Sequence, residues 1–421
     1  MRRILYCLFL GIIVIGCQKP HFIADNYLKQ AKKYLEEAKK YQEEWYKNSA
    51  LTGIESDPKY IEAMVIYEKK YRETNQMAIK YYEKVIKMNP QILNGEDYLK
   101  LGNAYFESLD TSKPSIQTLT QKEKIIDKAM KSFELALKLT PKMIDAYLGL
   151  ALCYEMKHQW DEAISECKKA LALEPKNANI YVIMGEIYRW KGKFDLAEVN
   201  FNKAIEIDDT HINAYLNLAG VSLTTGQPEK ALTRLKKVLY IKPDNLSAKV
   251  SLKIIDDSFS TIKQTKEKLR KDPKNFQLLR TIGRSYDQVG MWSEALKVYK
   301  EAYKVSPTYS IACDIAQCLI SNPFRTEEDI KSAIKILEEP RVQVKGGLKD
   351  FLTLETLARA YKADNDYEKA LESYKELMKL DPKNGLVYYY IGEVYEEIGN
   401  RKKAEQFFKK ASKLKQSQQF H

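Results

Sequence analysis

Few residues in this sequence have the type and spacing needed for acid–base or nucleophilic chemistry. The four histidines are isolated from one another: His21, His158, His211 and His421. His158 and His211 fall in predicted turns or helix starts, where a capping or solvated role is typical. The sequence has no GxSxG turn, no HExxH motif and no phosphate-binding glycine loop. We therefore expect no catalytic site, no metal site and no cofactor.

Cys17 is the cysteine whose surroundings indicate a definite reaction. It follows a basic start and an apolar run, Ile4 to Ile15, that has the length of a signal-peptide core and is too short to span a bilayer. The segment Val14 to Cys17 resembles a bacterial lipobox. This resemblance implies that residues 1–16 are a lipoprotein signal peptide and that Cys17 carries a diacyl or triacyl anchor, which holds stably because each buried methylene contributes about 0.8 kcal/mol. The alternative is an ordinary signal peptide with a chance cysteine.

Four further cysteines, Cys153, Cys167, Cys313 and Cys318, could form disulfides in an exported protein. Cys167 occupies a core position of the repeat described below, and Cys153 precedes a tyrosine expected to be buried. Cys313 and Cys318 are five residues apart, so they point to different faces of a helix. We predict four buried free thiols, with disulfide pairing as the alternative.

The elements that position these residues repeat with a fixed period. Tyr147, Tyr181 and Tyr215 are separated by 34 residues, and three alanines follow at the same interval: Ala163, Ala197 and Ala231. Within one period, apolar residues recur at spacings of three and four in two segments, which predicts two amphipathic helices. A period of this length is typical of stacked helical hairpins with an extended core and a broad binding surface.

The pattern resembles the tetratricopeptide repeat (TPR), whose signature is an aromatic residue, Leu-Gly or Leu-Ala, a tyrosine, and later an alanine, an aromatic residue, an alanine and a proline. One nearly complete unit consists of Tyr181, Met184, Gly185, Tyr188, Ala197, Phe201 and Ala204. The resemblance implies an all-α fold, a right-handed superhelical solenoid of hairpins, preceded by the signal peptide and one extra N-terminal helix. It also implies a binding protein and not an enzyme.

Interruptions of the repeat predict the domain organisation. Residues 17–56 should hold the lipidated tether and an amphipathic helix from Asn26 to Trp45, which we expect to cap a long helix from Pro58 to Met88; a membrane-surface helix is the alternative. The repeat array should extend over 57–340, with degenerate units at 57–90, 244–273 and 310–340 and an insertion at 108–124. At 244–273 the interval shortens to 30 residues, and we expect two plain helices there. Residues 341–350 should be a flexible joint before a C-terminal repeat pair at 351–421.

The net charge of +12 is spread in mixed strings of lysine and glutamate, which is typical of solvated helix faces. Nucleic-acid binding would need a clustered basic stripe on a defined module, so we expect no nucleic-acid partner. Weak attraction to anionic lipid head groups or cell-wall polymer is the simpler consequence of the charge.

The residues expected to bind a partner are those that the resemblance places between core positions on the first helices of the hairpins. This predicted groove consists of Asn103, Phe106, Glu186, Arg189, Trp190, Asn213, Leu216, Arg280, Arg284 and Arg359. Trp190 stands out, because a large ring at an open position is typical of a binding hot spot; the alternative is that the next hairpin partly covers this ring. The arginines could form a basic groove for an acidic peptide or a C-terminal carboxylate.

The last helix carries an apolar stripe that no further repeat follows: Ala404, Phe407, Phe408, Ala411 and Leu414. A terminal repeat normally has a polar outer face, so this stripe could seat a second copy or another partner.

Taken with the lipobox, the repeat resemblance implies a protein that is lipid-anchored to a cell membrane, facing the periplasm or the cell exterior. We expect it to scaffold envelope or outer-membrane proteins in its groove. The alternative is a surface-displayed lipoprotein that binds glycans or host molecules.

Overall fold

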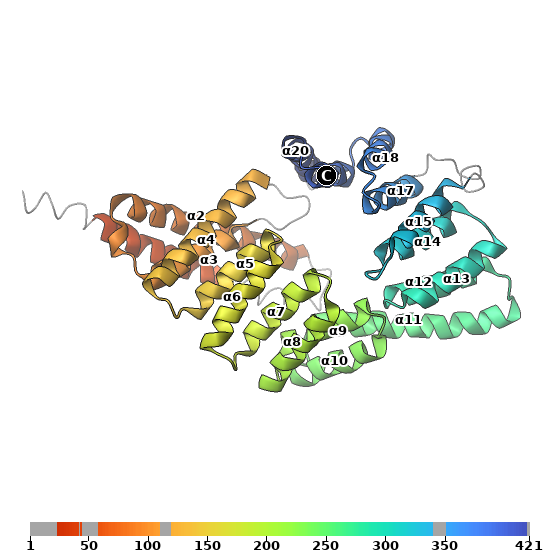
Figure 1. Ribbon diagram of the computed structural model, residues 1–421, viewed down its shortest axis with the longest axis horizontal. Coiled ribbons are helices and arrows are strands. Elements are labelled where there is room, and N and C mark those ends of the chain that lie inside the picture. The colour runs from red at the N-terminus through yellow and green to blue at the C-terminus, as the bar shows by residue number, and fades with distance from the viewer. Residues whose placement is uncertain (1–22, 42, 44–57, 110–118, 340–350, 419–421) are drawn as a thin grey trace, which may run out of the picture. The chain divides into compact units, whose positions relative to one another are not determined.

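The computed structural model describes residues 23–41, 43, 58–109, 119–339 and 351–418, and these residues form helices, turns and no strand (Figure 1). A helix over 23–41 comes first. The helices that follow, apart from a short 3-10 turn at Pro90–Ile92, are α2 (Pro58–Met88), α3 (Gly95–Glu107), α4 (Leu119–Leu139), α5 (Ile144–Met156), α6 (Trp160–Leu173), α7 (Ala178–Trp190), α8 (Phe194–Ile207), α9 (Ile212–Thr224), α10 (Pro228–Ile241), α11 (Leu246–Lys271), α12 (Phe276–Gln288), α13 (Trp292–Val305), α14 (Tyr309–Ser321), α15 (Glu327–Glu338), α17 (Phe351–Ala363), α18 (Tyr367–Leu380), α19 (Gly385–Glu397) and α20 (Arg401–Gln418). The predicted all-α solenoid of TPR hairpins is confirmed.

The helices belong to two compact units. One comprises residues up to Ile187 except 110–119, and the other comprises 110–119 and the residues from Tyr188 onward. The predicted signal peptide, Cys17 and the predicted joint at 341–350 lie outside the described residues, and so does most of the insertion at 108–124.

Regular hairpins combine a first helix of 13 residues with a second helix of 14, as in α5 with α6, α9 with α10, and α12 with α13. The turn between the two helices holds one residue with positive φ. Glycine takes this place at Gly192, Gly226, Gly290 and Gly399, and His158 and Asn365 take it in two other hairpins. His158 is thus a turn residue, and His211 caps α9 by accepting a hydrogen bond from the Ala214 amide.

Small residues let the helices of a hairpin approach closely. The Phe133 ring of α4 lies against both Gly102 of α3 and Gly149 of α5, where an added Cβ atom would come within 2.5 Å of the ring. Ala163 and Ala197 are fully buried. The positions that define the repeat in the sequence are therefore the points of closest contact between helices.

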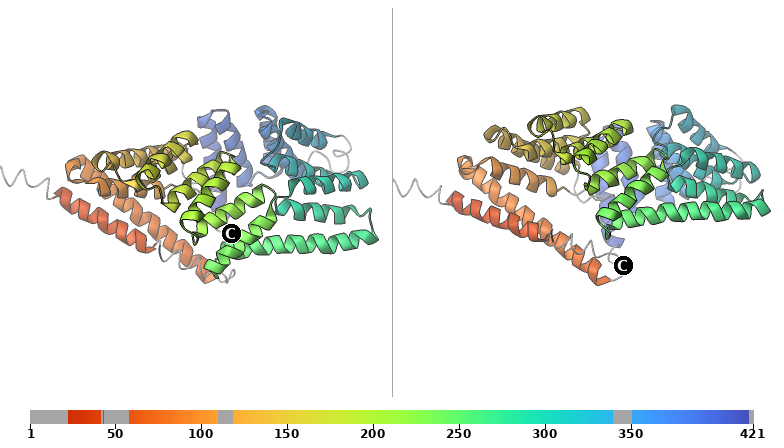
Figure 2. Two further views of the ribbon diagram at one scale, coloured as in Figure 1. Left: turned by 60° about the horizontal axis from the view of Figure 1, so that its bottom comes forward. Right: turned by 90° about the horizontal axis from the view of Figure 1, so that it is seen from below.

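Residues 244–273 do not form the two helices that we expected. They form α11, one unbroken helix of 26 residues, while the neighbouring helices have 13 or 14 (Figures 1 and 2). The segment between Pro243 and Pro273 contains no glycine and no proline, so nothing ends the helix at the point where other repeats turn. The four residues missing from the usual interval of 34 correspond to the missing turn.

Because α11 is continuous, it packs against α10 along its first half and against α12 along its second half. Ala248 and Ile255 join the apolar cluster that holds Leu235 and Val238 of α10, and the Ser258 hydroxyl lies 3.1 Å from Oε1 of Gln288 in α12. The hairpins α9–α10 and α12–α13 consequently meet at their turns. There the Trp292 indole N–H donates to the Thr224 carbonyl over 3.2 Å.

The predicted N-terminal cap is confirmed for the helix over 23–41. Ala24, Ala31 and Ala38, spaced by seven residues, are buried, which is the pattern of a helix packed along a partner helix. Tyr27 and Tyr34 contact the Tyr81 ring of α2, with centroids 5.8 and 5.6 Å apart.

The apolar stripe of the last helix is covered in part, and its members Phe407 and Leu414 are half-buried. Ala404, Phe408 and Ala411 are buried, and the Phe407 ring stacks on Tyr388 and Tyr395 of α19. The buried residues of the stripe form the inner face of the α19–α20 hairpin. The degenerate unit at 310–340 is likewise a full hairpin of α14 and α15.

Candidate functional site

Trp190 lies at the C-terminal end of α7. Of the residues in the predicted groove, it is the large aromatic residue whose side chain is exposed to solvent. Its side chain is 58% exposed. The guanidinium carbon of Arg189 lies 4.5 Å from the centre of the indole ring, a cation–π arrangement that holds the ring in one orientation. An oriented, exposed indole beside a cation is well suited to bind a partner side chain.

Other members of the predicted groove divide into open and packed residues. Asn213 is exposed on α9, and Asn103 is exposed on α3, where it borders a hollow of about 450 Å³ between the helix over 23–41, α2 and α3. Phe106 and Leu216 are partly buried, and both pack against apolar clusters of the core. Glu186 is half-buried on α7.

Arg280 is not the open groove residue that the sequence suggested. Its side chain is only 16% exposed and pairs with the 13% exposed carboxylate of Asp314 on the next first helix, α14. Arg284 is 54% exposed, and its guanidinium lies 3.1 Å from the same carboxylate. Asp314 therefore holds α12 and α14 together, and two of the four predicted groove arginines serve this structural contact.

Asp287 lies near this pair, on the last turn of α12. Burial, together with the Asp314 carboxylate, raises the pKa of the Asp287 carboxyl to about 6. Its Oδ1 atom is buried and has no hydrogen-bond partner. The charge of the Asp287 carboxyl consequently depends on pH in the range around 6.

Arg359 lies on α17 and borders a hollow of about 420 Å³ formed by α17, α18, α19 and the end of α14. One of its guanidinium nitrogens donates to Oε1 of Gln317 over 3.1 Å. Next to it, the Lys362 ammonium contacts Glu393 at 3.0 Å and Glu397 at 3.1 Å. The rim therefore presents both charges, and the hollow is suited to polar backbone and mixed side chains more than to a purely acidic peptide.

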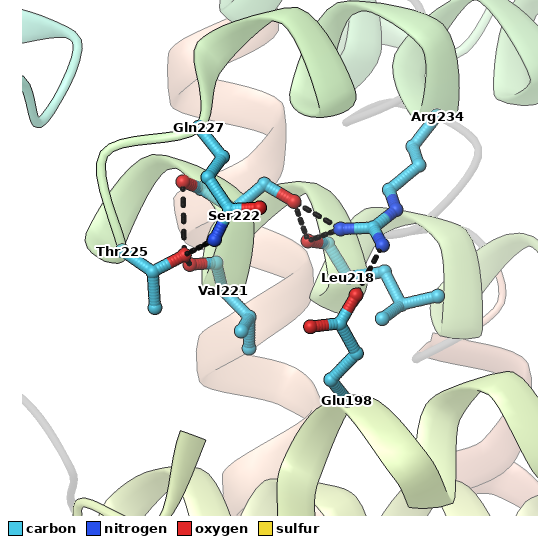
Figure 3. Close-up of polar contacts among 7 residues, drawn as sticks. All are labelled: Glu198, Leu218, Val221, Ser222, Thr225, Gln227 and Arg234. Carbon is cyan, nitrogen blue, oxygen red and sulfur yellow. Dashed lines mark hydrogen bonds and ion pairs between the residues drawn. The ribbon is translucent and has the colours of Figure 1, made fainter. Parts of the chain in front are cut away.

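A polar network on α8, α9 and α10 was not foreseen from the sequence (Figure 3). Ser222 stands at the repeat position usually taken by tyrosine. The Arg234 guanidinium reaches this place, donates to the Leu218 carbonyl over 2.9 Å and to the Ser222 hydroxyl, and pairs with Glu198 at 2.6 Å. In other repeats a tyrosine makes the bond to the preceding helix: Tyr105 donates to Glu83, and Tyr361 donates to Glu338. The network is thus structural.

The predicted buried free thiols are confirmed for Cys153, Cys167, Cys313 and Cys318. Burial raises the pKa of the thiols of Cys153, Cys167 and Cys318 to about 12, so these three are protonated and unreactive at neutral pH. In the part of the chain that the structure describes, no three His, Cys, Asp or Glu side chains gather as metal ligands. None of the described helices has the length and apolar composition needed to cross a bilayer.

Comparisons with known proteins locate repeats of one kind along the chain. A model described as "TPR repeat" matches residues 358–399, and three models described as "Tetratricopeptide repeat" match 191–252, 144–177, and 73–92 with 386–418. These segments include helices of both compact units.

Curated relatives share part of their sequence with this chain. Protein bimA of Emericella nidulans is 24% identical over 170 residues, which cover 33% of this chain and 21% of the relative. A BBSome complex member BBS4 homolog of Drosophila melanogaster is 27% identical over 139 residues, 32% of this chain and 28% of the relative. The chain thus spans less than a third of the length of these relatives.

Among solved structures, a thermophilic TPR protein in Thermus thermophilus is 22% identical, with 43% of this chain and 89% of that chain covered and a TM-score of 0.34. The hairpin geometry and the matched models agree on one architecture. The protein is an all-helical solenoid built from tetratricopeptide repeats.

Proposed function

We propose that this protein is a membrane-anchored TPR lipoprotein that scaffolds other proteins in the bacterial cell envelope. TPR proteins are generally scaffolds for protein–protein interaction and are typically not enzymes, and the fold is theirs. The lipobox-like segment ending at Cys17 supports the anchor and export. A shared stack of hairpins outside the cytoplasm would give envelope proteins a common platform.

The exposed Trp190 ring is the observation that carries the protein-binding part of this proposal. Burying a large aromatic side chain in an interface contributes more than most other contacts, and tryptophan and arginine are the residues most enriched at binding hot spots. Trp190 and Arg189 are one tryptophan and one arginine at adjacent positions, and the guanidinium already contacts the indole ring. Little side-chain entropy would be lost when a partner covers this ring.

Co-purification from detergent-solubilised cells tests the proposal. The parent protein and Trp190→Ala should be compared by quantitative mass spectrometry of the captured proteins. We expect the variant to keep its melting temperature, because exposed substitutions usually change stability by less than about 0.5 kcal/mol. The envelope proteins captured by the parent should fall at least about tenfold, the equivalent of 1.4 kcal/mol of lost contact.

Tyr240→Ala is the matched control. Tyr240 is also an exposed aromatic residue, 82% accessible, with a cation 5.4 Å above its ring in Lys237, but it lies on α10, the second helix of its hairpin. Capture should be unchanged in this variant. Equal losses for Trp190→Ala and Tyr240→Ala, or none for either, would contradict the assignment of the binding surface to the first helices.

A surface-displayed glycan- or host-binding lipoprotein is the second candidate. It is favoured by the same exposed indole, since aromatic faces also stack on sugar rings. Recovery of cell-wall fragments in place of envelope proteins would support this candidate. Proteolysis of intact cells, which removes only proteins displayed outside, separates the two further.

A further inference from the structure

Three hairpins share a tyrosine hydrogen bond at the turn that leads into their first helix, a place that we call the corner of the hairpin. In each, a Pro-Lys pair precedes the first helix, and a tyrosine six residues after the proline donates its hydroxyl to the carbonyl of that proline. These pairs are Tyr147 with Pro141 at 3.2 Å, Tyr181 with Pro175 at 3.3 Å, and Tyr388 with Pro382 at 3.0 Å. The hydrogen bond ties the first helix of the hairpin to the chain just after the preceding helix.

The hairpin α12–α13 has the same sequence pattern without the tyrosine. Pro273 and Lys274 precede α12, and the residue six positions after the proline is Leu279. Leucine has neither the ring nor the hydroxyl, so it cannot make the bond to the Pro273 carbonyl. Here the structure has a hollow of about 480 Å³, and both Pro273 and Leu279 line it.

The hollow lies between the ends of α11 and α13 and the start of α12. Its apolar lining comes from Leu269, Leu279 and Val305, of which Val305 is 42% exposed. Three cations, Lys266, Arg270 and Lys304, and one carboxylate, Glu301, complete the lining. The hollow thus combines an apolar floor with a net positive rim.

We infer that this hollow, the α12 corner pocket, binds a tyrosine side chain of a partner protein within an acidic segment. The phenol ring would lie in this hollow, and its hydroxyl would donate to the Pro273 carbonyl. Carboxylates on either side would pair with Arg270 and Lys304. The inference deepens the proposed scaffold function, because it gives the chemistry of one segment that the scaffold would hold.

Fluorescence anisotropy with short labelled peptides on the purified protein tests the inference. The probe has one tyrosine flanked by glutamates; a second peptide has alanine in place of the tyrosine, and a third has phenylalanine. We expect the tyrosine peptide to bind at least about tenfold more tightly than the alanine peptide, with the phenylalanine peptide between them. No tyrosine-dependent binding up to about 1 mM peptide would overturn the inference.

Leu279→Tyr supplies the missing side chain from within the protein and is the decisive variant. Leu279 is only 5% exposed and lines the hollow at the position that the tyrosines occupy in the other three hairpins. Leu279→Tyr should abolish peptide binding, while Val250→Tyr, which adds a tyrosine at an exposed position of α11, should bind as the parent does. Retained binding in a folded Leu279→Tyr protein would refute the site.

A charge variant keeps the test valid if Leu279→Tyr does not fold. Arg270→Glu combined with Lys304→Glu should weaken the acidic peptide at least about tenfold, whereas Lys237→Glu with Lys249→Glu, an equal charge change elsewhere, should not. Equal weakening in both would mean that net charge alone attracts the peptide, and the pocket assignment would fail. These titrations use no envelope protein, so their failure would leave the co-purification result for Trp190 standing.

Discussion

Replacing Gly290 by alanine should separate the two hairpins that meet beside α11. Gly290 lies in the α12–α13 turn with a φ of +76°, and an added Cβ atom would come within 1.7 Å of the Leu223 carbonyl oxygen of α9. Normal contact requires more than 3 Å, so the turn and the end of α9 would have to move apart. The nearby hydrogen bond from Trp292 to Thr224 would be lost or stretched.

Three costs add to the expected loss of stability. Positive φ disfavours any residue with a Cβ atom by about 1 kcal/mol. The lost hydrogen bond contributes about 1 kcal/mol, and relief of the backbone clash costs about 1–3 kcal/mol more. We expect Gly290→Ala to lower the free energy of unfolding by about 3 kcal/mol or more, measured by urea denaturation with circular dichroism.

Gly192→Ala is the matched control that measures the conformational cost of positive φ alone. Gly192 has the same φ of +76°, but nothing lies within 4 Å of the position where its Cβ atom would be. This variant should lose only the conformational cost of about 1 kcal/mol. If both substitutions lower the urea midpoint equally, the turn-to-turn contact contributes nothing and our account of the α11 junction is wrong.

Three other predictions concern pH, the first helices and the anchor. Since the pKa of Asp287 is raised to about 6, the stabilisation from its protonated form is fully present below about pH 4 and is lost as the pH rises through 6. Asp287→Asn should thus gain up to about 2 kcal/mol in urea denaturation at pH 8 and almost nothing at pH 4. Arg280→Glu places a second carboxylate beside Asp314 and should lower the melting temperature, whereas Trp190→Ala should not; similar melting curves would contradict the ion pair. Cys17→Ser should block lipidation and release the exported protein from membranes, and labelled fatty acid on the variant would disprove the anchor.

Periodicity predicted most of the hairpins because the repeat depends on close contacts that only small residues permit. Gly102 and Gly149 face the same phenylalanine, and any larger residue at either position would collide with its ring. The resemblance to the repeat family predicted an open position for Trp190, between the core positions of its helix. The free thiols followed from their core positions in the repeat.

The continuous α11 was missed although its signal was present. The interval between Pro243 and Pro273 is shortened to 30 residues, and no glycine or proline lies within it. A helix continues unless something ends it, and no residue here supplies a positive φ or removes an amide donor. When a repeat lacks its turn residues and is about four residues short, the sequence predicts that its two helices form one continuous helix.

The Arg280 pairing was missed for a different reason, since its partner Asp314 lies 34 residues farther along the chain. Residues one period apart occupy equivalent positions on adjacent first helices and lie side by side. Opposite charges at this separation are therefore a signal for an ion pair between repeats. A side chain that is exposed in an isolated hairpin, such as that of Arg280, is covered by the neighbouring hairpin in the folded protein.

Ser222 shows how a repeat can lose a signature residue and keep its contact. The tyrosine expected there would bond to a glutamate on the preceding helix, as Tyr105 does with Glu83. Arg234 enters the same space from the following helix and pairs with Glu198, which takes the place of that glutamate (Figure 3). The glutamate partner is kept, and only the residue that reaches it has changed. The α12 corner concerns a different repeat position, that of Tyr147 and Tyr181. Leu279 stands there without a hydroxyl and lines the hollow in which our inference places a tyrosine of a partner.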